Sequence, residues 1–190
     1  MTGYVWIHSA SMSGDTFTTL NTRTTTNPIS TVRDGVPMTS GIVLSRTLPS
    51  VSDLVIDDAT YHVEMTTELV NGRYRVRRMD VTTDDGDVSA TLLRKIPVSV
   101  ILARSAEHGI LRWQASGDDS ISYSPVSIMD FDDEVQRAAV MYQLSFAVGA
   151  RPAKAVSDVL GIPYATAKKR ISQARERGLL GQTTSGRAGA

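Results

Sequence analysis

The residues best suited to chemistry lie in the stretch 164–177, towards the C-terminal end of the sequence. If this stretch is a helix, its outward face carries aromatic, hydroxyl, amide and cationic side chains: Tyr164, Thr166, Lys168, Lys169, Arg170, Gln173 and Arg175. Lysine and arginine pair with phosphates or with guanine, and glutamine bonds adenine or phosphate. An α-helix fits in the major groove of B-DNA, where the residues near its N-terminus reach base edges. The stretch therefore predicts contact with double-stranded DNA.

The basic residues of the sequence are also concentrated in its C-terminal part. The 190 residues contain 20 Lys and Arg and 20 Asp and Glu, so the formal net charge is zero. Residues 1–149 hold 12 basic and 18 acidic side chains, whereas residues 150–190 hold eight basic and two acidic ones. A basic C-terminal segment indicates a polyanionic partner. A contact between an acidic body and a basic tail explains the same split equally well.

Two short helices joined by a turn would position these side chains. The first, 152–160, begins with a proline, which the first position of a helix tolerates, and Gly161-Ile162-Pro163 makes a tight turn before the second helix. The inward positions are apolar: Val156, Leu160, Ile162, Ala167 and Ile171. Helix, short turn with glycine and helix is the helix-turn-helix layout. The alternative is a basic, solvated helix within an ordinary helical domain.

The expected DNA contacts come from both helices. They are Arg151, Lys154, Tyr164, Ala165, Thr166, Lys168, Lys169, Arg170, Ser172, Gln173 and Arg175. Successive helical residues are about 100° apart, so the three consecutive cations cannot all face bases. Lys168 and Lys169 follow Tyr164 and Ala165 by one turn and are expected to point into the groove. Arg170 is expected at the wall of the groove, on phosphate.

A family resemblance rests on the same segment. The residues that carry it are Pro152, Ala153, Lys154, Ala155, Val156, Leu160, Gly161, Thr166, Ala167, Ile171, Ala174, Arg175, Gly178, Leu179 and Leu180. With them, residues 134–180 resemble the C-terminal module of uncharacterised actinobacterial and actinophage proteins. The upstream segment NGRYRVRRMDVTTDDGDVSATLLRKIPVSVIL is similar to a strand pair of those proteins, so the resemblance covers about residues 68–180. It implies DNA binding through a helix-turn-helix module.

Two positions depart from the pattern of that family. Pro163 stands where a serine would cap the second helix, which removes a side-chain cap of the usual kind. Arg170 stands where the pattern often has tryptophan, so a packing contact is replaced by a charged side chain. Both changes bear on how the second helix would dock on DNA.

Upstream, alternating apolar and polar runs on either side of Asn71-Gly72 predict a long antiparallel hairpin over residues 59–83. Arginines at 73, 75 and 77 would share one face of its second strand. We expect them to pair with acidic residues of a neighbouring strand, such as Glu64 and Glu68. The alternative is that they contact phosphates beside the helix-turn-helix.

Composition and periodicity predict the remaining organisation. The Thr-rich segment 11–31 fits either a flexible arm or an edge strand. Residues 89–108 fit a helix in two pieces broken by Pro97, and residues 114–130 fit a linker. Residues 131–148 form a helix with acidic residues in its first turn and a stop at Gly149.

Other chemistry finds little support. The sequence has no cysteine, which excludes disulfides, thiol nucleophiles and thiolate zinc sites. The three histidines, His8, His62 and His108, lie far apart and have no partner at metal-binding spacing. Residues 84–95 fail the EF-hand pattern because the twelfth is lysine. We therefore expect no enzyme activity, no catalytic residues, no metal and no cofactor.

These features predict an α+β fold with two domains. Residues 1–128 would form a β-rich domain with a long antiparallel hairpin and a helix. Residues 129–190 would form an all-α helix-turn-helix domain with a flexible C-terminal tail. No apolar run is long enough to cross a membrane and no secretory leader is visible, so we expect a cytoplasmic protein.

The expected function is binding of double-stranded DNA, as a transcriptional regulator of an actinobacterium or its phage. One helix-turn-helix makes few contacts, so a homo-oligomer, a dimer in the simplest case, is expected. The N-terminal part would supply the interface or a surface for a protein partner. Two alternatives stay open: a protein–protein interaction module, such as a phage assembly or host-modulating factor, and a DNA-recognition subunit in packaging, partition or recombination.

Overall fold

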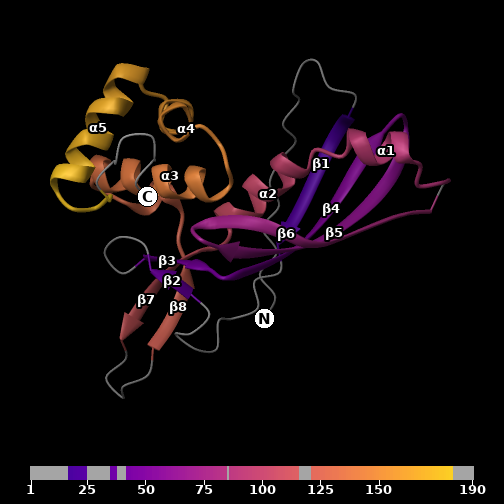
Figure 1. Cartoon of the computed structure of the whole chain (residues 1–190), viewed down its shortest axis with the longest axis horizontal. Coiled ribbons are helices and arrows are strands. Elements are labelled where there is room, and N and C mark those ends of the chain that lie inside the picture. The colour runs from indigo at the N-terminus through magenta and orange to yellow at the C-terminus, as the bar shows by residue number, and fades with distance from the viewer. Residues whose placement is uncertain (1–16, 25–34, 38–41, 85, 116–120, 182–190) are drawn as a thin grey trace.

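A computed structural model of the chain describes residues 17–24, 35–37, 42–84, 86–115 and 121–181. Over these residues the fold is α+β, as the sequence predicts, with two antiparallel four-stranded sheets and five α-helices. Figure 1 shows the last three helices gathered at one end of the molecule, the larger sheet at the other and the smaller sheet below the helices. The predicted C-terminal tail, 182–190, lies outside the described residues.

The larger sheet has the order β1-β4-β5-β6. Its strands are β1 (Phe17–Thr24), β4 (Thr47–Ile56), β5 (Ala59–Val70) and β6 (Arg73–Thr83). The predicted hairpin is confirmed, and Asn71 and Gly72 both have the positive φ angles, 52° and 73°, that its two-residue turn requires. Of the segment 11–31, residues 17–24 form the outermost described strand of this sheet, and the rest lies outside the described residues.

A β-bulge interrupts the regular alternation along β6. Thr67 lies opposite Val76 and Thr66 lies opposite Arg78, so Arg77 is an extra residue in the second strand. One extra residue exchanges the two faces of a strand. Tyr74 is therefore buried before the bulge, whereas after it the odd-numbered Met79 and Val81 pack against the core. Val76, opposite Thr67 just before the bulge, is 38% exposed.

The smaller sheet has the order β2-β3-β7-β8. Its strands are β2 (Gly35–Pro37), β3 (Ile42–Ser45), β7 (Ile110–Ala115) and β8 (Ile121–Pro125). The prediction of a linker over 114–130 is wrong, because β8 pairs with β7 and residues Ile128–Asp130 form a short 3-10 helix, η2. Val126 and Ile128 are buried, so this segment belongs to the folded body.

The helical segment 89–108 divides as predicted into α1 (Ala90–Lys95) and α2 (Val98–Glu107). Pro97 separates the two helices because proline lacks the N–H that a continuous helix would use. The hydroxyl of Ser89 caps α1 by accepting the N–H of Leu92 at 3.1 Å. In α2, Ile101 and Leu102 are buried, and the helix packs against β1 and β4.

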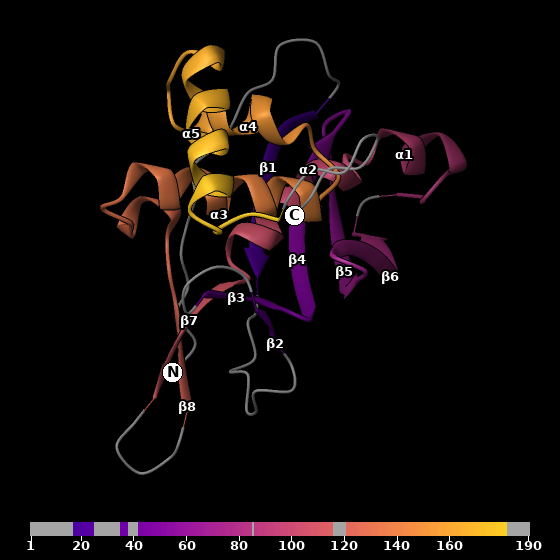
Figure 2. The ribbon, with the colours of Figure 1, turned by 60° about the vertical axis from the view of Figure 1, so that its left-hand side comes forward.

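Helix α3 (Glu134–Ala147) is the centre of the helical end. It contacts α4 (Pro152–Val159) and α5 (Tyr164–Glu176) as well as η2, α2 and β6. Ala138, Ala139 and Val140 are fully buried although they point in different directions around the helix. A helix that is apolar on nearly every face is covered on nearly every face. Figure 2 shows α5 crossing α3 steeply.

Most of the buried apolar side chains form one continuous cluster. It joins Leu48 and Val63 of the larger sheet to Val140 of α3 and Ile171 of α5. At the end of α3, the ring of Phe146 lies under the β5–β6 turn, where the guanidinium of Arg73 stacks on it at 4.7 Å. The division into domains at residues 128 and 129 stays a prediction.

Candidate nucleic-acid interface

The two helices α4 and α5 are joined by residues 160–163. Pro152 occupies the first turn of α4, as predicted, and Leu160 ends that helix. Gly161 then adopts a left-handed conformation, with φ of 62°, which a glycine takes without strain. Pro163 precedes α5 and makes no side-chain cap, as its sequence predicts. The chain thus reverses between the helices in four residues.

Ser157 holds this turn closed. Its hydroxyl donates to the carbonyl oxygen of Ile162 at 2.7 Å, and its own carbonyl oxygen accepts the N–H of Ile162 at 3.1 Å. Two hydrogen bonds between the same residues fix where α5 begins relative to α4. The small serine also suits a position where two helices approach each other closely.

The inner face of the pair is apolar and tightly covered. Val156, Ala167 and Ala174 are fully buried, and Ile171 is 3% exposed. Leu160 and Ile162 are half-buried and pack against the same core. These are the inward positions that the sequence predicts, so α5 has one defined orientation on α3 and α4.

The outer face of α5 is therefore also defined. Its exposed residues before Glu176 follow one helical stripe: Tyr164, Ala165, Lys168, Lys169 and Ser172; Glu176 is also exposed and continues the stripe by one turn. Tyr164 is 54% exposed, and the ammonium group of Lys168 lies 5.9 Å from the centre of its ring. No carboxylate occurs in α5 before Glu176, which accepts a hydrogen bond from Ser172 at 3.2 Å. We call these five residues the outer stripe.

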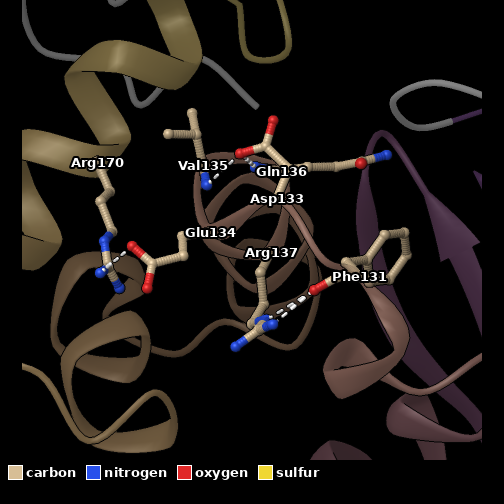
Figure 3. A network of polar contacts seen from close by, with 7 residues as sticks. All are labelled: Phe131, Asp133, Glu134, Val135, Gln136, Arg137 and Arg170. Carbon is tan, nitrogen blue, oxygen red and sulfur yellow. Dashed lines mark hydrogen bonds and ion pairs between the residues drawn. The ribbon is translucent and has the colours of Figure 1, made fainter.

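Arg170 and Arg175 do not belong to this stripe, and the prediction that they point outward is wrong. The side chain of Arg170 is only 18% exposed and forms an ion pair with Glu134 in the first turn of α3. Figure 3 shows Arg170 extending from α5 to that carboxylate. Arg175 donates from Nη2 to the hydroxyl of Tyr142 at 3.1 Å and stacks on its ring at 5.1 Å. Both arginines face α3 because the helical periodicity places them beside Ala167, Ile171 and Ala174.

Thr166 and Gln173 are half-buried at the borders of the stripe. Arg151 and Lys154, at the start of α4, are exposed. Lys154 forms an ion pair with Asp158 one turn later at 2.9 Å. The two cations line an open groove that the ring of Tyr164 closes on the side of α5. The structure therefore brings Arg151, Lys154 and the outer stripe to one side of the α4–α5 pair.

The acidic first turn of α3 has a role that the sequence does not indicate. Asp133 accepts the N–H groups of Val135 and Gln136, at 2.8 and 3.4 Å, and so caps α3. The hydrogen bond from Val135, with help from Gln136 and from Arg177, lowers the pKa of this carboxyl below its usual value. Arg177, just after α5, binds the same carboxylate at 2.7 Å. Asp133 and Glu134 thus bind one arginine just after α5, Arg177, and one in the middle of α5, Arg170.

Outside this region, other candidate groups do not assemble into a site. Nδ1 of His62 on β5 donates to the carboxylate of Asp53 at 2.7 Å, and His108 lies at the end of α2, far along the chain. His8 lies outside the described residues. Within the described part of the chain, no three acidic or histidine side chains converge as a metal site would require. None of the helices described is both long and apolar enough to cross a bilayer.

The arrangement can do one kind of chemistry well. Helix α5 presents two lysines, a tyrosine and a serine on an exposed stripe that ends at Glu176, and Arg151 and Lys154 lie beside it, with Lys154 in an ion pair with Asp158. Lysine, arginine, serine and tyrosine side chains are groups that can contact phosphates. Comparisons with known protein families, with curated proteins and with solved structures found no match for this chain.

Proposed function

We propose that this chain binds double-stranded DNA, with α4 and α5 acting as a helix-turn-helix and α5 lying in the major groove. The observation that carries the proposal is the outer stripe: it is exposed and carries two lysines, the one carboxylate of α5 (Glu176) lies in the last turn, and the opposite face of α5 is buried. An α-helix is about 10–12 Å wide with its side chains, and the major groove is about 12 Å wide. A helix anchored along one face and exposed along the other therefore fits the groove.

Each residue of the outer stripe would contact a different part of the DNA, depending on its position. Lys168 and Lys169 would reach base edges in the groove, with Tyr164, Ala165 and Ser172 contacting bases or sugar nearby. Arg151 and Lys154, beside the groove of the α4–α5 pair, would contact phosphates. Thr166 and Gln173 would lie at the borders of the interface. Arg170 and Arg175 would hold α5 in place, since α3 already engages them.

A biological role follows from this activity. A protein that binds DNA by sequence suits transcriptional regulation. The resemblance to actinobacterial and actinophage proteins gives this role its proposed setting. A protein–protein interaction module is the alternative that the same exposed helix allows.

The test is a titration of a fluorescent DNA duplex at several salt concentrations. If α5 binds DNA, the association constant falls steeply as salt rises, because bound phosphates release counterions. Lys169→Gln should weaken binding. The matched control is Arg94→Gln on α1, which removes one exposed charge far from α5 and should leave binding unchanged. A wild-type protein that binds no duplex at any salt concentration would favour the protein-interaction role.

A further inference from the structure

The charges on strands β4 to β6 are sorted by position along the strands. Towards the β5–β6 turn, residues 45–49 and 66–78 contain five arginines and one carboxylate, Glu68. Towards the opposite end, residues 50–65 and 79–84 contain six carboxylates and neither lysine nor arginine. The strands run side by side in register, so these counts describe two ends of one surface. One end of the sheet is basic and the other is acidic.

The bulge at Arg77 decides which of these arginines are neutralised. Arg75 lies opposite Glu68 in the strand register, yet the guanidinium of Arg77 binds Glu68 at 2.6 Å. Arg75 is left exposed, and none of the described carboxylates lies within ion-pair distance of it. Arg46 is exposed and equally unpaired among the residues described, and its carbonyl oxygen accepts the N–H of Leu69 at 2.7 Å. Arg46 thus belongs to the same end.

The basic end is held against the helices. Arg73 stacks on Phe146 in the last turn of α3, and the same ring lies 3.7 Å from where a Cβ atom of Gly72 would be. Cations are favoured at the C-terminal end of a helix, where carbonyl oxygens concentrate negative charge. Figure 1 shows the β5–β6 turn reaching this end of α3, from which the chain continues into α4. Arg151, at the start of α4, follows Phe146 by five residues.

Two structural roles explain why some of these arginines occur on this strand. Arginines on an outermost strand, and a bulge within it, prevent pairing with a strand of another molecule. Arg77 and Arg78 also satisfy carboxylates, Glu68 and Asp80, each at 2.6 Å. Neither role explains why Arg46 and Arg75 remain unpaired on the side nearest the α3–α4 connection. An exposed cluster of like charges costs stability, so a counter-charge from outside the chain is the simpler account.

We propose that this basic end of the hairpin, defined as Arg46, Arg73 and Arg75, contacts the phosphate backbone of the duplex that α5 reads. The inference rests on the proposed function, because α5 must first bring the duplex to this side of the molecule. The acidic end of the same sheet repels phosphates. The duplex is therefore oriented along one end of the sheet, and the hairpin adds affinity without adding base contacts.

The experiment measures binding of a fluorescent duplex of about 30 base pairs by fluorescence anisotropy, using the full-length chain between ~0.05 and ~0.3 M salt. Arg46→Gln and Arg75→Gln should each lower the slope of log association constant against log salt by about 0.9, the value for one phosphate contact. Binding at low salt should weaken several-fold. Two controls remove the same charge: Arg94→Gln on α1, and Arg78→Gln, whose side chain already serves Asp80. Both should keep the wild-type slope.

The outcomes separate the two proposals. If the wild-type chain binds DNA, Lys169→Gln weakens it and both hairpin variants behave like the two controls, the hairpin contact is overturned and the proposed function stands. If Arg94→Gln lowers the slope as much as Arg75→Gln does, net charge rather than position is responsible, and the hairpin contact is again overturned. If the wild-type chain shows no salt-dependent binding, both proposals are overturned. Thermal unfolding by circular dichroism verifies that each variant is folded.

Discussion

Arg170 of α5 forms an ion pair with Glu134 of α3, and this pair joins residues that are 36 positions apart in the sequence. The pair fixes which way α5 is turned about its own axis. It leaves Lys168 and Lys169, rather than Arg170, on the solvent side. The same three consecutive cations therefore serve two purposes, one within the fold and one at its surface.

The pair should be measurable as an energetic coupling. We expect Arg170→Ala to lower the free energy of unfolding, and a double-mutant cycle with Glu134→Ala to give a coupling of about 1 kcal/mol, since the pair is partly exposed. Urea unfolding followed by circular dichroism supplies the four free energies. A coupling of zero would mean that the two side chains do not interact in solution.

Ile171 has the largest of the buried side chains of α5. It is 3% exposed among residues of α3 and α4, so Ile171→Asp places an unpaired charge in the core. We expect a loss on the order of 4 kcal/mol in the free energy of unfolding. The control is Ser172→Asp at the neighbouring exposed position, which should change the free energy of unfolding by less than about 0.5 kcal/mol. Equal unfolding midpoints for the two variants would show that the face of α5 has been assigned wrongly.

Asp133 should stabilise α3 through its cap. Asp133→Ala removes two hydrogen bonds to backbone N–H groups and the partner of Arg177, and we expect a cost of about 1 kcal/mol. Asp132→Ala, at the adjacent exposed position, is the matched control. Because the pKa of Asp133 is lowered by folding, its contribution is present above the ordinary carboxyl pKa and is lost as pH falls through the folded value. A cost that is unchanged at low pH would contradict the cap.

His62 should titrate above the ordinary value for histidine. Its hydrogen bond to Asp53 raises its pKa above 6.5, with smaller help from the charges of Asp53 and Asp84. Protonation is thus favoured in the folded state, so the stabilisation is complete below the unfolded pKa and is lost as pH rises through the folded one. Nuclear magnetic resonance titration of the ring protons tests this, and Asp53→Asn should bring the pKa of His62 back down.

His108 is the internal control in that titration. Burial lowers its pKa below 6.5, because desolvation disfavours the charged ring. The two histidines should therefore titrate on opposite sides of the ordinary value. Coincident titration curves for His62 and His108 would contradict at least one of these two environments.

The chain should be at least dimeric. One α5 offers a small surface for specific DNA recognition, and paired recognition helices commonly reach half-sites about 34 Å apart. We expect sedimentation at micromolar concentration to give a dimer or larger assembly, with the N-terminal part as its main interface. A strict monomer both with and without DNA would exclude this arrangement.

Much of the local structure could be predicted from the sequence. The turn at Asn71-Gly72, the break at Pro97 and the stop at Gly149 depend on backbone preferences of single residues, and all three are confirmed. The buried positions Val156, Ala167 and Ile171 follow from helical periodicity alone.

What could not be predicted depends on contacts between distant segments. The composition of residues 114–130 is typical of a loop. Ile121–Pro125 nevertheless forms a strand, because it pairs with the backbone of β7. The bulge at Arg77 has no local signature, and it exchanges the faces of β6 for every residue that follows. From the sequence alone, Arg170 and Arg175 are indistinguishable from surface cations. Only the folded structure brings Glu134 and Tyr142 of α3 next to them.

The ring of Phe146 under the β5–β6 turn ties the helices α3 to α5 to the hairpin. This contact bears on which fragments of the chain can fold and on which segments recombination can exchange. A fragment beginning near residue 129 would keep α3, α4 and α5 but lose the turn that covers this ring and the strands and helices that cover the rest of α3. Recombination that moved the three helices into another protein would carry an uncovered apolar flank with them. The helices and the hairpin are therefore expected to travel together as one unit of exchange, and substitutions at Gly72, Arg73 and Phe146 are expected to compensate one another.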